Sequence, residues 1–340
     1  MNTGQTSNPL SLPADILLIL QCPSCHRSLE MAAAGLSCPG CERLYPAANG
    51  VVSFTGESNY ADNFGFEWTY FARTQLDRHE GDESEKAFRE RTGFKPEELR
   101  GKLVLDVGCG MGRFAEVATR WGARVVGVDL SKAAEVAAKN LSDRGRASFF
   151  RTDVFALPFA PESFDFIYSL GVLHHTPDCE RAFKALPALL KPGGTIAIWL
   201  YSAYNNWYRM SDLYRKLTPQ LSQRVLLNLC RVAVPLYHLH RGLKRVPLLG
   251  RVASGSLAFL LPVSLHANPE VRVLDTFDWY SPKFQSKHTY EEVFRWFEAC
   301  DLESLRVLEQ TVSVRGSKPA RGSPAGAVFE NDFNSYTQSR

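Results

Sequence analysis

Apolar runs and polar segments alternate through the middle of the chain. Five short runs consist mostly of aliphatic, β-branched and aromatic residues, at 103–107, 123–129, 149–153, 163–171 and 195–201. Runs of this length predict buried strands, and the longer segments between them predict helices. Regular alternation of strand and helix is typical of an α/β domain.

The same pattern resumes near the end of the chain. Thr289 and Glu292 have the spacing of a capping box, which predicts the start of a helix, and 305–308 and 311–314 can supply two more strands. Within the helix expected before the fifth strand, Pro187 removes one backbone hydrogen bond and predicts a kink.

The first predicted strand runs into a glycine-rich turn. Asp106 is followed by Gly108, Gly110 and Gly112 at alternate positions. Because glycine has no Cβ, the backbone of such a turn can pass close to a bound nucleotide. A dinucleotide fingerprint has its third glycine one position later, where this chain has Arg113, so the spacing points away from NAD.

Carboxylates also follow the next two predicted strands. Asp129 ends the second strand, 17 residues after Gly112, and an acid at this position can accept hydrogen bonds from ribose hydroxyls. Asp153 ends the third strand. Open α/β sheets bind their ligands at the carboxyl ends of the strands, so the three acids predict a ribose-bearing cofactor.

Taken in order, these motifs resemble those of the class I S-adenosylmethionine-dependent methyltransferases. The resemblance covers about residues 102–201 and includes the stretch Gly171 to Pro177 and the turn Lys191 to Gly194. It implies a Rossmann-like, doubly wound sheet of seven strands with S-adenosyl-L-methionine as the cofactor. It also implies cofactor contacts from Asp106, Gly108, Cys109, Gly110, Gly112, Asp129, Leu130, Asp153, Val154, Ser169, Leu170 and Gly171.

Four cysteines near the N-terminus have the spacing of a zinc site. Cys22, Cys25, Cys38 and Cys41 form the pattern C-x2-C-x12-C-x2-C. Four thiolate ligands leave no coordination position open for water, so we expect the zinc to be structural. The segment is too short to fold around its own apolar core, and the metal would supply much of its folding free energy. It resembles the zinc ribbon of the Trm112-like family over residues 18–56.

The segment between this ribbon and the first core strand is rich in aromatic residues. We expect them to pack on the core, as buried aromatics usually do. The alternative is a lid over the cofactor, in which Tyr70, Arg73 and Gln75 would reach the methionine end. The charged continuation at 77–91 predicts a solvated helix.

An insertion separates the fifth strand from the end of the sheet. Its apolar periodicity predicts several helices over 203–288, which we expect to form a cap with a buried interior that shapes the acceptor site. The alternative is an amphipathic surface with Arg241, Lys244, Arg245 and Arg251 facing anionic lipid or RNA. Polar residues and a proline interrupt its apolar stretch, which makes a transmembrane helix unlikely.

The expected organisation follows from these boundaries. It comprises a disordered N-terminus (1–17), the zinc ribbon (18–56), an aromatic linker or lid (57–100), the cofactor-binding core (101–202), the helical insertion (203–288), the end of the core sheet (289–315) and a disordered tail (316–340).

Methyl transfer is an in-line displacement in which the protein mainly aligns acceptor, methyl group and sulfur. A base is needed only when the acceptor must lose a proton. The candidate bases are His174, His175 and His288, and Tyr201 is a candidate hydrogen-bond donor.

Composition limits the remaining function classes. The net charge is only +3, with 39 Lys and Arg against 36 Asp and Glu, which is weak support for a nucleic-acid partner. No signal peptide is evident at the N-terminus, so we expect a cytoplasmic protein. We expect a small-molecule or lipid-linked acceptor methylated on O, N or C. The alternatives are an rRNA or tRNA methyltransferase that contacts RNA through the ribbon, and a non-catalytic scaffold that retains the cofactor.

Overall fold

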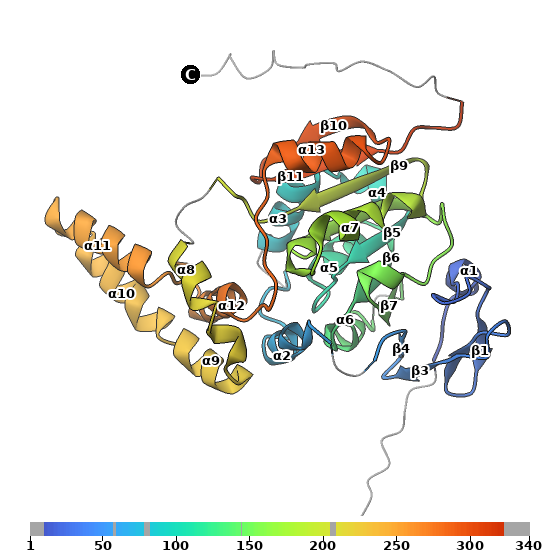
Figure 1. The fold of residues 1–340 in the computed structure, drawn as a ribbon, viewed down its shortest axis with the longest axis horizontal. Helices are drawn as coiled ribbons and strands as arrows, with labels where there is room; N and C mark the ends of the chain where they lie inside the picture. Colours follow the sequence, from blue (N-terminus) through green and yellow to red (C-terminus); the bar gives the residue numbers. More distant parts are fainter. Residues whose placement is uncertain (1–9, 57–58, 78–81, 144, 205–208, 323–340) are drawn as a thin grey trace, which may run out of the picture.

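The computed structural model describes residues 10–56, 59–77, 82–143, 145–204 and 209–322. Its centre is one mixed sheet of eleven strands, in the order β1-β2-β3-β4-β7-β6-β5-β8-β9-β11-β10 (Figure 1). The predicted α/β sheet is therefore confirmed, but the predicted number of seven strands is too low.

Seven of the strands form the core of the sheet. The five strands β5 to β9 pair in parallel, and β11 and β10 add antiparallel to the edge at β9. Their bounds are β5 Leu103–Val107, β6 Arg124–Asp129, β7 Ala147–Arg151, β8 Phe164–Leu170, β9 Leu190–Trp199, β10 Glu303–Val307 and β11 Ser313–Ser317.

The four additional strands come from the N-terminal ribbon. They are β1 Glu30–Ala32, β2 Gly35–Ser37, β3 Leu44–Ala48 and β4 Val51–Ser53. Strand β4 lies parallel to β7, with Val52 opposite Phe150 and Ser53 opposite Arg151. Because Val52 is fully buried in this pairing, the ribbon continues the core sheet and is not a separate unit.

Helices cover both faces of the sheet. Alternate strand residues point to opposite faces, so Val104 and Leu105 belong to two different core clusters. One face is covered by α3 Glu83–Thr92, α4 Pro96–Leu99, α5 Arg113–Arg120 and α6 Ala133–Asn140; the other is covered by α1 Ala14–Ile19, α7 Cys179–Lys184 and α13 Tyr290–Glu298. This arrangement is the doubly wound architecture expected from the sequence.

Four local expectations need correction. The expected disordered start includes α1, whose Ile16 is buried, and the expected disordered tail begins inside β11, which ends at Ser317. Helix α3 packs Phe88 into the core, so it is not solvated on all sides. Pro187 does not kink a helix, because α7 ends before it and Pro187 begins a separate 3₁₀ turn.

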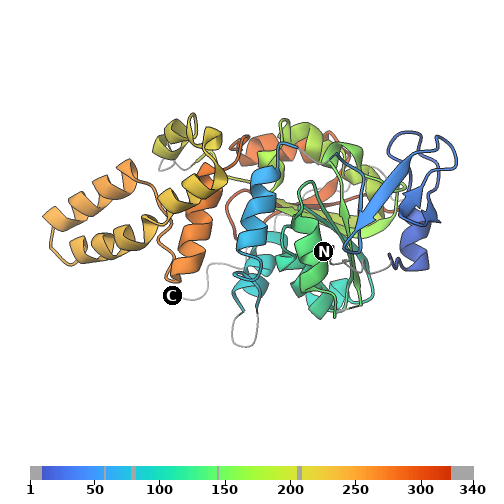
Figure 2. The ribbon, with the colours of Figure 1, turned by 90° about the horizontal axis from the view of Figure 1, so that it is seen from below.

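Between β9 and α13, the described residues form five α-helices. They are α8 Arg209–Tyr214, α9 Gln223–Cys230, α10 Ala233–Leu243, α11 Leu249–Leu260 and α12 Pro269–Tyr280. Helix α12 lies next to α2 Asp62–Tyr70, whereas α10 and α11 form a hairpin that projects from the body at the end opposite the ribbon (Figures 1 and 2). Among the described residues, no helix combines the length and apolarity needed to cross a membrane.

Candidate active site

A cavity with about 1020 Å³ of empty space lies where β5, β6 and β8 end. Eight of the predicted cofactor residues line it: Gly108, Cys109, Gly110, Asp129, Leu130, Val154, Leu170 and Gly171.

The glycine loop forms the floor of the cavity. Gly108 and Gly110 have φ angles of 79° and 52°, in the left-handed region that other residues avoid. A Cβ on Gly108 would lie 2.3 Å from a methyl group of Val172, and one on Gly110 would lie 3.2 Å from the indole nitrogen of Trp68. The loop therefore has no space for a side chain at Gly108, and at Gly110 one would press against Trp68. Gly112 lies outside the cavity, where it forms the N-cap of α5.

Asp129 forms one wall and is held firmly. Its Oδ2 accepts a hydrogen bond from the Gly110 amide at 3.0 Å, and its Oδ1 accepts from the amide and hydroxyl of Ser131 at 2.8 and 2.7 Å. Burial raises the pKa of this carboxyl, while the hydrogen bonds act against that shift. Oδ1 thus uses both of its lone pairs, whereas Oδ2 still has one for a further donor such as a ribose hydroxyl.

Asp106 and Ser169 lie beneath the cavity and do not line it. Asp106 is buried, and burial raises the pKa of its carboxyl to about 8. The hydroxyl of Ser169 donates to the Val107 carbonyl at 3.0 Å, which ties β8 to β5 below the loop. Both residues therefore support the loop from below.

Asp153 is also absent from the cavity lining. Its carboxylate accepts a hydrogen bond from the Phe155 amide at 3.1 Å and caps the 3₁₀ turn Val154–Ala156, while Thr152 and Val154 on either side line the cavity. The hydroxyl of Tyr60 lies near Asp153 and Asp129, and burial together with these charges raises the pKa of that phenol.

Helix α2 and its flanking residues cover the cavity, as the lid alternative supposed, but with different side chains. Tyr60, Phe64, Trp68 and Gln75 line it. Tyr70 does not: its ring is 51% exposed, and its hydroxyl accepts a hydrogen bond from Arg231. Phe64 and Trp68 are one helical turn apart, whereas Tyr70 is two residues further on and points in nearly the opposite direction. Arg73 is exposed and also lies outside the cavity.

Of the predicted catalytic residues, only His175 faces the cavity. Its Nδ1 lies 3.0 Å from the Phe284 carbonyl oxygen, and its Nε2 has no partner among the described residues. Burial lowers the pKa of His175 to about 4, so its imidazole is uncharged at neutral pH. His174 is fully buried behind it and packs against Tyr201, with 4.0 Å between the ring centroids.

The other two candidates have different surroundings. The Tyr201 hydroxyl donates to Asp278 on α12 at 2.6 Å. The Nε2 atom of His288 lies 2.7 Å from the hydroxyl oxygen of Ser286. His288 lines a separate hollow together with Cys179 and Trp296. The rings of His174, His175 and Tyr201 thus form one cluster, with centroids 4.0 to 5.5 Å apart, but only His175 reaches the cavity and His288 lines a different hollow.

Two arginines that we did not predict lie at the inner end of the cavity. Arg91 stacks 4.2 Å from the centroid of the Trp199 ring, and Arg113 Nε donates to the Ser84 hydroxyl at 2.9 Å. Both also line an adjoining polar hollow of about 750 Å³ that reaches Asp275 on α12. Arg113 could have been proposed because it directly follows the glycine loop, but nothing in the helical pattern around Arg91 distinguished it from a surface residue.

The four ribbon cysteines converge on one point. Their Sγ atoms all lie within 4.8 Å of one another. The separation is 3.6 Å for Cys22 and Cys41 and 3.3 Å for Cys25 and Cys38, which is far longer than a disulfide bond of about 2.05 Å. Four sulfur atoms around one ion in a tetrahedral zinc site are roughly 3.8 Å apart, as 2.3 Å bonds require, so the cluster fits such an ion.

Comparison with known proteins gives matches over the same region. Residues 105–198 match a family model described as a methyltransferase domain. A ubiquinone biosynthesis O-methyltransferase of Coxiella burnetii is 39% identical over 100 residues, which cover 29% of this chain and 43% of that protein. Phosphoethanolamine N-methyltransferase 2 of Caenorhabditis elegans is 32% identical over 143 residues, which cover 41% of this chain and 31% of that protein.

A third relative is the yeast sterol 24-C-methyltransferase of Saccharomyces cerevisiae, which is 33% identical over 129 residues; these cover 36% of this chain and 33% of that protein. The chain thus spans less than half the length of each of these relatives. The residues matched by the family model include the glycine loop and Asp129. Residues 105–198 therefore form a methyltransferase domain of the S-adenosylmethionine-dependent type.

Proposed function

We propose that this chain transfers the methyl group of S-adenosylmethionine to a small-molecule or lipid-linked acceptor. The observation that carries the proposal is the cavity at the ends of β5, β6 and β8, built from the matched domain and covered by α2. The names of the three relatives refer to ubiquinone biosynthesis, to phosphoethanolamine and to a sterol, which supports a small acceptor.

In this proposal the cofactor occupies the part of the cavity next to the glycine loop and Asp129. Asp129 accepts the ribose hydroxyls, and Leu130 and Val154 flank the adenine. The backbone of Gly108 and Gly110 lies against the centre of the molecule. Bound S-adenosylmethionine supplies a methyl group on a positively charged sulfur, and the residues of the chain hold it in line with the acceptor.

The acceptor approaches from the adjoining polar hollow. Gln75, Arg91 and Arg113 line both spaces, and the far side of the hollow is formed by Val271 and Asp275 of α12. The helices after β9 thus supply one wall of the acceptor site. His175 faces the cavity as a neutral imidazole whose Nε2 can accept a hydrogen bond from an acceptor group.

Metabolite profiling tests this function. Purified chain and S-adenosylmethionine are added to a small-molecule extract and to a separate lipid extract, and products heavier by one methyl group are sought together with S-adenosylhomocysteine. We expect such a product in one of these extracts. Methyl incorporation that requires added RNA would contradict the proposal, and failure to form S-adenosylhomocysteine with any fraction would favour a scaffold.

We also propose that the ribbon cysteines hold one structural zinc ion. The convergence of four Sγ atoms supports this, and so does the small core of the ribbon. With four thiolates the ion has no open position and takes no part in methyl transfer. The resemblance to Trm112-like ribbons is consistent with the same role.

Metal analysis tests the zinc site. The purified chain should contain one zinc equivalent, and Cys22→Ser should contain much less. Cys300→Ser is a matched control, because Cys300 is a partly buried thiol remote from the cluster. Full retention of zinc and normal thermal stability in Cys22→Ser would rule out the four-cysteine site.

A further inference from the structure

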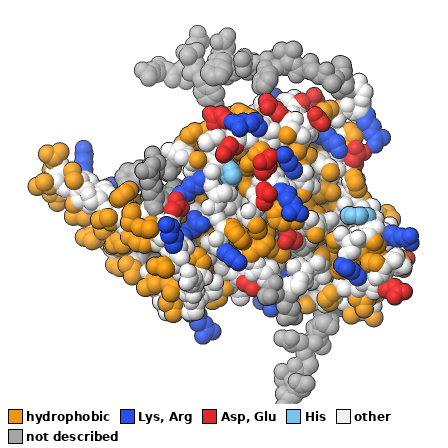
Figure 3. Space-filling view, in the orientation of Figure 1, with side chains coloured by type: hydrophobic (Ala, Val, Ile, Leu, Met, Phe, Trp, Pro, Cys, Tyr) orange, Lys and Arg blue, Asp and Glu red, His pale blue; other side chains and the backbone are white. Residues whose placement is uncertain are grey.

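The helices after β9 expose far more apolar surface than the rest of the molecule. Of the 21 large apolar side chains that are exposed among the described residues, 15 lie between Leu213 and Leu265. Single exposed apolar residues are ordinary, but clusters of this size mark interaction surfaces. Figure 3 shows this surface at the left-hand end of the molecule.

The apolar side chains are concentrated at the tip of the α10–α11 hairpin. Leu248 and Leu249 are each 78% exposed, Val252 is 65% exposed and Val246 is 51% exposed. The tip is the part of the hairpin farthest from the sheet (Figures 1 and 2). Among the described residues, these four side chains are therefore left largely uncovered.

Basic residues surround the tip. Arg241, Lys244, Arg245 and Arg251 are all exposed, and no ion pair among the described residues involves them. The hairpin contains no Asp or Glu at all. Residues 209–266 hold nine of the 39 Lys and Arg but only one of the 36 Asp and Glu, which leaves 30 basic and 35 acidic residues elsewhere. Residues 209–266, which we call the arm, are therefore strongly basic although the net charge of the whole chain is small.

The hairpin is built to hold this tip in place. The hydroxyl of Ser254 on α11 lies 2.8 Å from His240 Nδ1 on α10, and both side chains are buried. Gly250 allows close contact at the turn, since a Cβ there would lie 2.0 Å from the Leu243 carbonyl oxygen. At the base, the buried Arg272 of α12 stacks 3.6 Å from the centroid of the Tyr237 ring on α10. These contacts hold α10 and α11 together and fix the hairpin to α12.

We propose that the α10–α11 hairpin docks on an anionic lipid bilayer, with Val246, Leu248, Leu249 and Val252 buried at the boundary between headgroups and acyl chains. Aliphatic side chains flanked by Arg and Lys match both layers of such a surface. A second copy of the chain would bring like charges together, since the hairpin has no acidic residue. RNA would be recognised by basic and aromatic side chains, and four aliphatic residues at the tip would contribute little.

Vesicle flotation with the full chain tests the docking. Vesicles of phosphatidylcholine alone are compared with vesicles that contain phosphatidylglycerol, at low and at high salt. We expect binding to the anionic vesicles and a loss of binding as salt rises, because the basic residues are screened. The double variant Leu248→Asp/Leu249→Asp should bind at least tenfold more weakly. The triple variant Lys244→Gln/Arg245→Gln/Arg251→Gln should lose most of its preference for anionic lipid.

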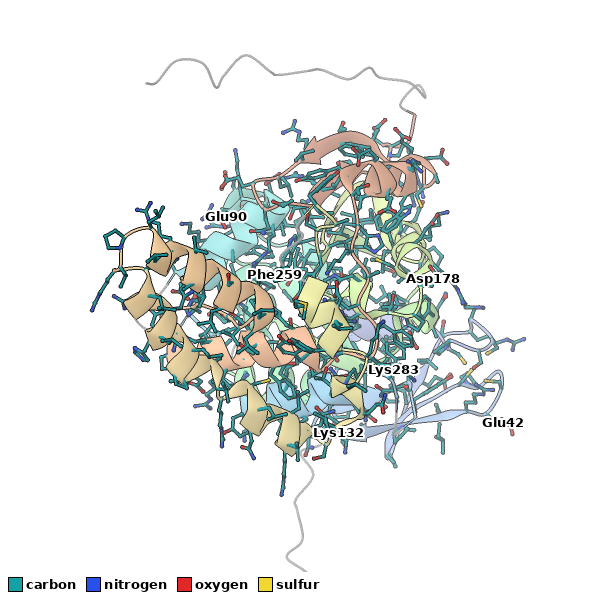
Figure 4. All side chains as sticks on the ribbon, turned by 60° about the vertical axis from the view of Figure 1, so that its left-hand side comes forward. Glu42, Glu90, Lys132, Asp178, Phe259 and Lys283 are labelled. Carbon is teal, nitrogen blue, oxygen red and sulfur yellow. The ribbon has the colours of Figure 1, made fainter. Side chains whose placement is uncertain are left out.

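The matched control is Leu18→Asp. Leu18 is 81% exposed on α1, beside the ribbon at the opposite end of the molecule, and its substitution should leave vesicle binding unchanged. In Figure 4, Glu42 marks the ribbon, and Phe259 lies near the C-terminal end of α11, the end of that helix away from the tip. Circular dichroism and S-adenosylhomocysteine binding establish that the variants are folded.

Three results would overturn the proposal: no flotation of the native chain, equal flotation of the native chain and the double aspartate variant, or equal binding to neutral and anionic vesicles. Salt-sensitive RNA binding without vesicle binding would assign the arm to RNA instead. The docking proposal does not depend on methyl transfer, since vesicle binding is measured without an acceptor.

Discussion

Two glycines of this chain share a backbone conformation but differ in their surroundings. Gly108 and Gly101 have φ angles of 79° and 74°, so alanine at either position should cost about 1 kcal/mol in backbone strain. Around Gly101 there is nothing within 4 Å of an added Cβ, whereas at Gly108 the Cβ would collide with Val172. Gly108→Ala should therefore displace the cavity floor and weaken S-adenosylhomocysteine binding more than tenfold.

Gly101→Ala is the control and should bind S-adenosylhomocysteine within about twofold of the native affinity, although it loses similar backbone stability. Titration calorimetry measures both affinities, and urea unfolding measures both stabilities. Equal affinities for the two variants would mean that the loop does not lie against the cofactor.

The buried His175 gives the chain a defined acid sensitivity. Its folded-state pKa of about 4 lies below its ordinary value of 6.5, so the unfolded chain binds the proton more readily. This difference costs nothing above pH 7 and destabilises the fold as pH falls from 6.5 toward 4. Between pH 7.5 and pH 5, the native chain should lose about 2 kcal/mol more unfolding free energy than His175→Gln does. Urea unfolding at the two pH values measures this, and identical losses would contradict the buried neutral imidazole.

At the scale of residues, the spacing of motifs in the sequence predicted several of the residues that line the cavity. Gly108, Gly110 and Asp129 line the cavity because the strand, turn and helix that hold them are contiguous. Tyr70 was predicted wrongly because the aromatic cluster did not reveal which helix face is covered. Arg91 was missed because it reaches the cavity only through the packing of α3 on the sheet.

At the scale of elements, the ribbon and the sheet edge depend on each other. The Phe54 amide donates to the Arg151 carbonyl at 2.7 Å, and the Gln21 amide donates to the Pro158 carbonyl at 2.8 Å. We expect a chelator to unfold the ribbon and free this edge, while the central strands stay folded. Limited trypsin digestion with mass spectrometry should then show new cleavage after Arg27 and Arg43, which are exposed residues within the ribbon.

Cleavage at these two sites should remain slow when zinc is added back in excess. Sites in the described core between β5 and β9 should be cut at the same rate with and without metal. Loss of the whole fold on chelation, or no change at all, would contradict a ribbon stabilised locally by the ion.

The strands themselves were largely predictable, since apolar runs bounded by turns mark them. Their joining to the ribbon was not, because the pairing of Val52 with Phe150 links residues almost a hundred positions apart and leaves no local signal. The same holds for Pro187. The local pattern predicts a kinked helix, whereas packing ends α7 early and uses the proline to start a 3₁₀ turn.

At the scale of the whole molecule, helix α2 connects the cofactor cavity to the helices after β9. It covers the cavity through Phe64 and Trp68, and on its other side the Asn63 amide donates to the Ser281 hydroxyl at 3.2 Å. A cofactor bound under α2 should therefore reduce local opening of both α2 and the end of α12. The hairpin tip and the ribbon lie at the two far ends, and none of their described residues belongs to the cavity lining, so we expect their exchange rates to stay unchanged (Figure 2).

Hydrogen exchange with and without S-adenosylhomocysteine measures this division. At a ligand concentration of 100 times Kd, binding stabilises the closed state by about 2.7 kcal/mol, so amides that exchange through opening of α2 should slow by about 100-fold. Amides at the α10–α11 tip, which exchange through local opening, should keep their rates. If the ligand slowed exchange more at the tip than in α2, this arrangement would be contradicted. The cofactor's main contacts would then lie in the arm, and the glycine loop would lack its proposed ligand.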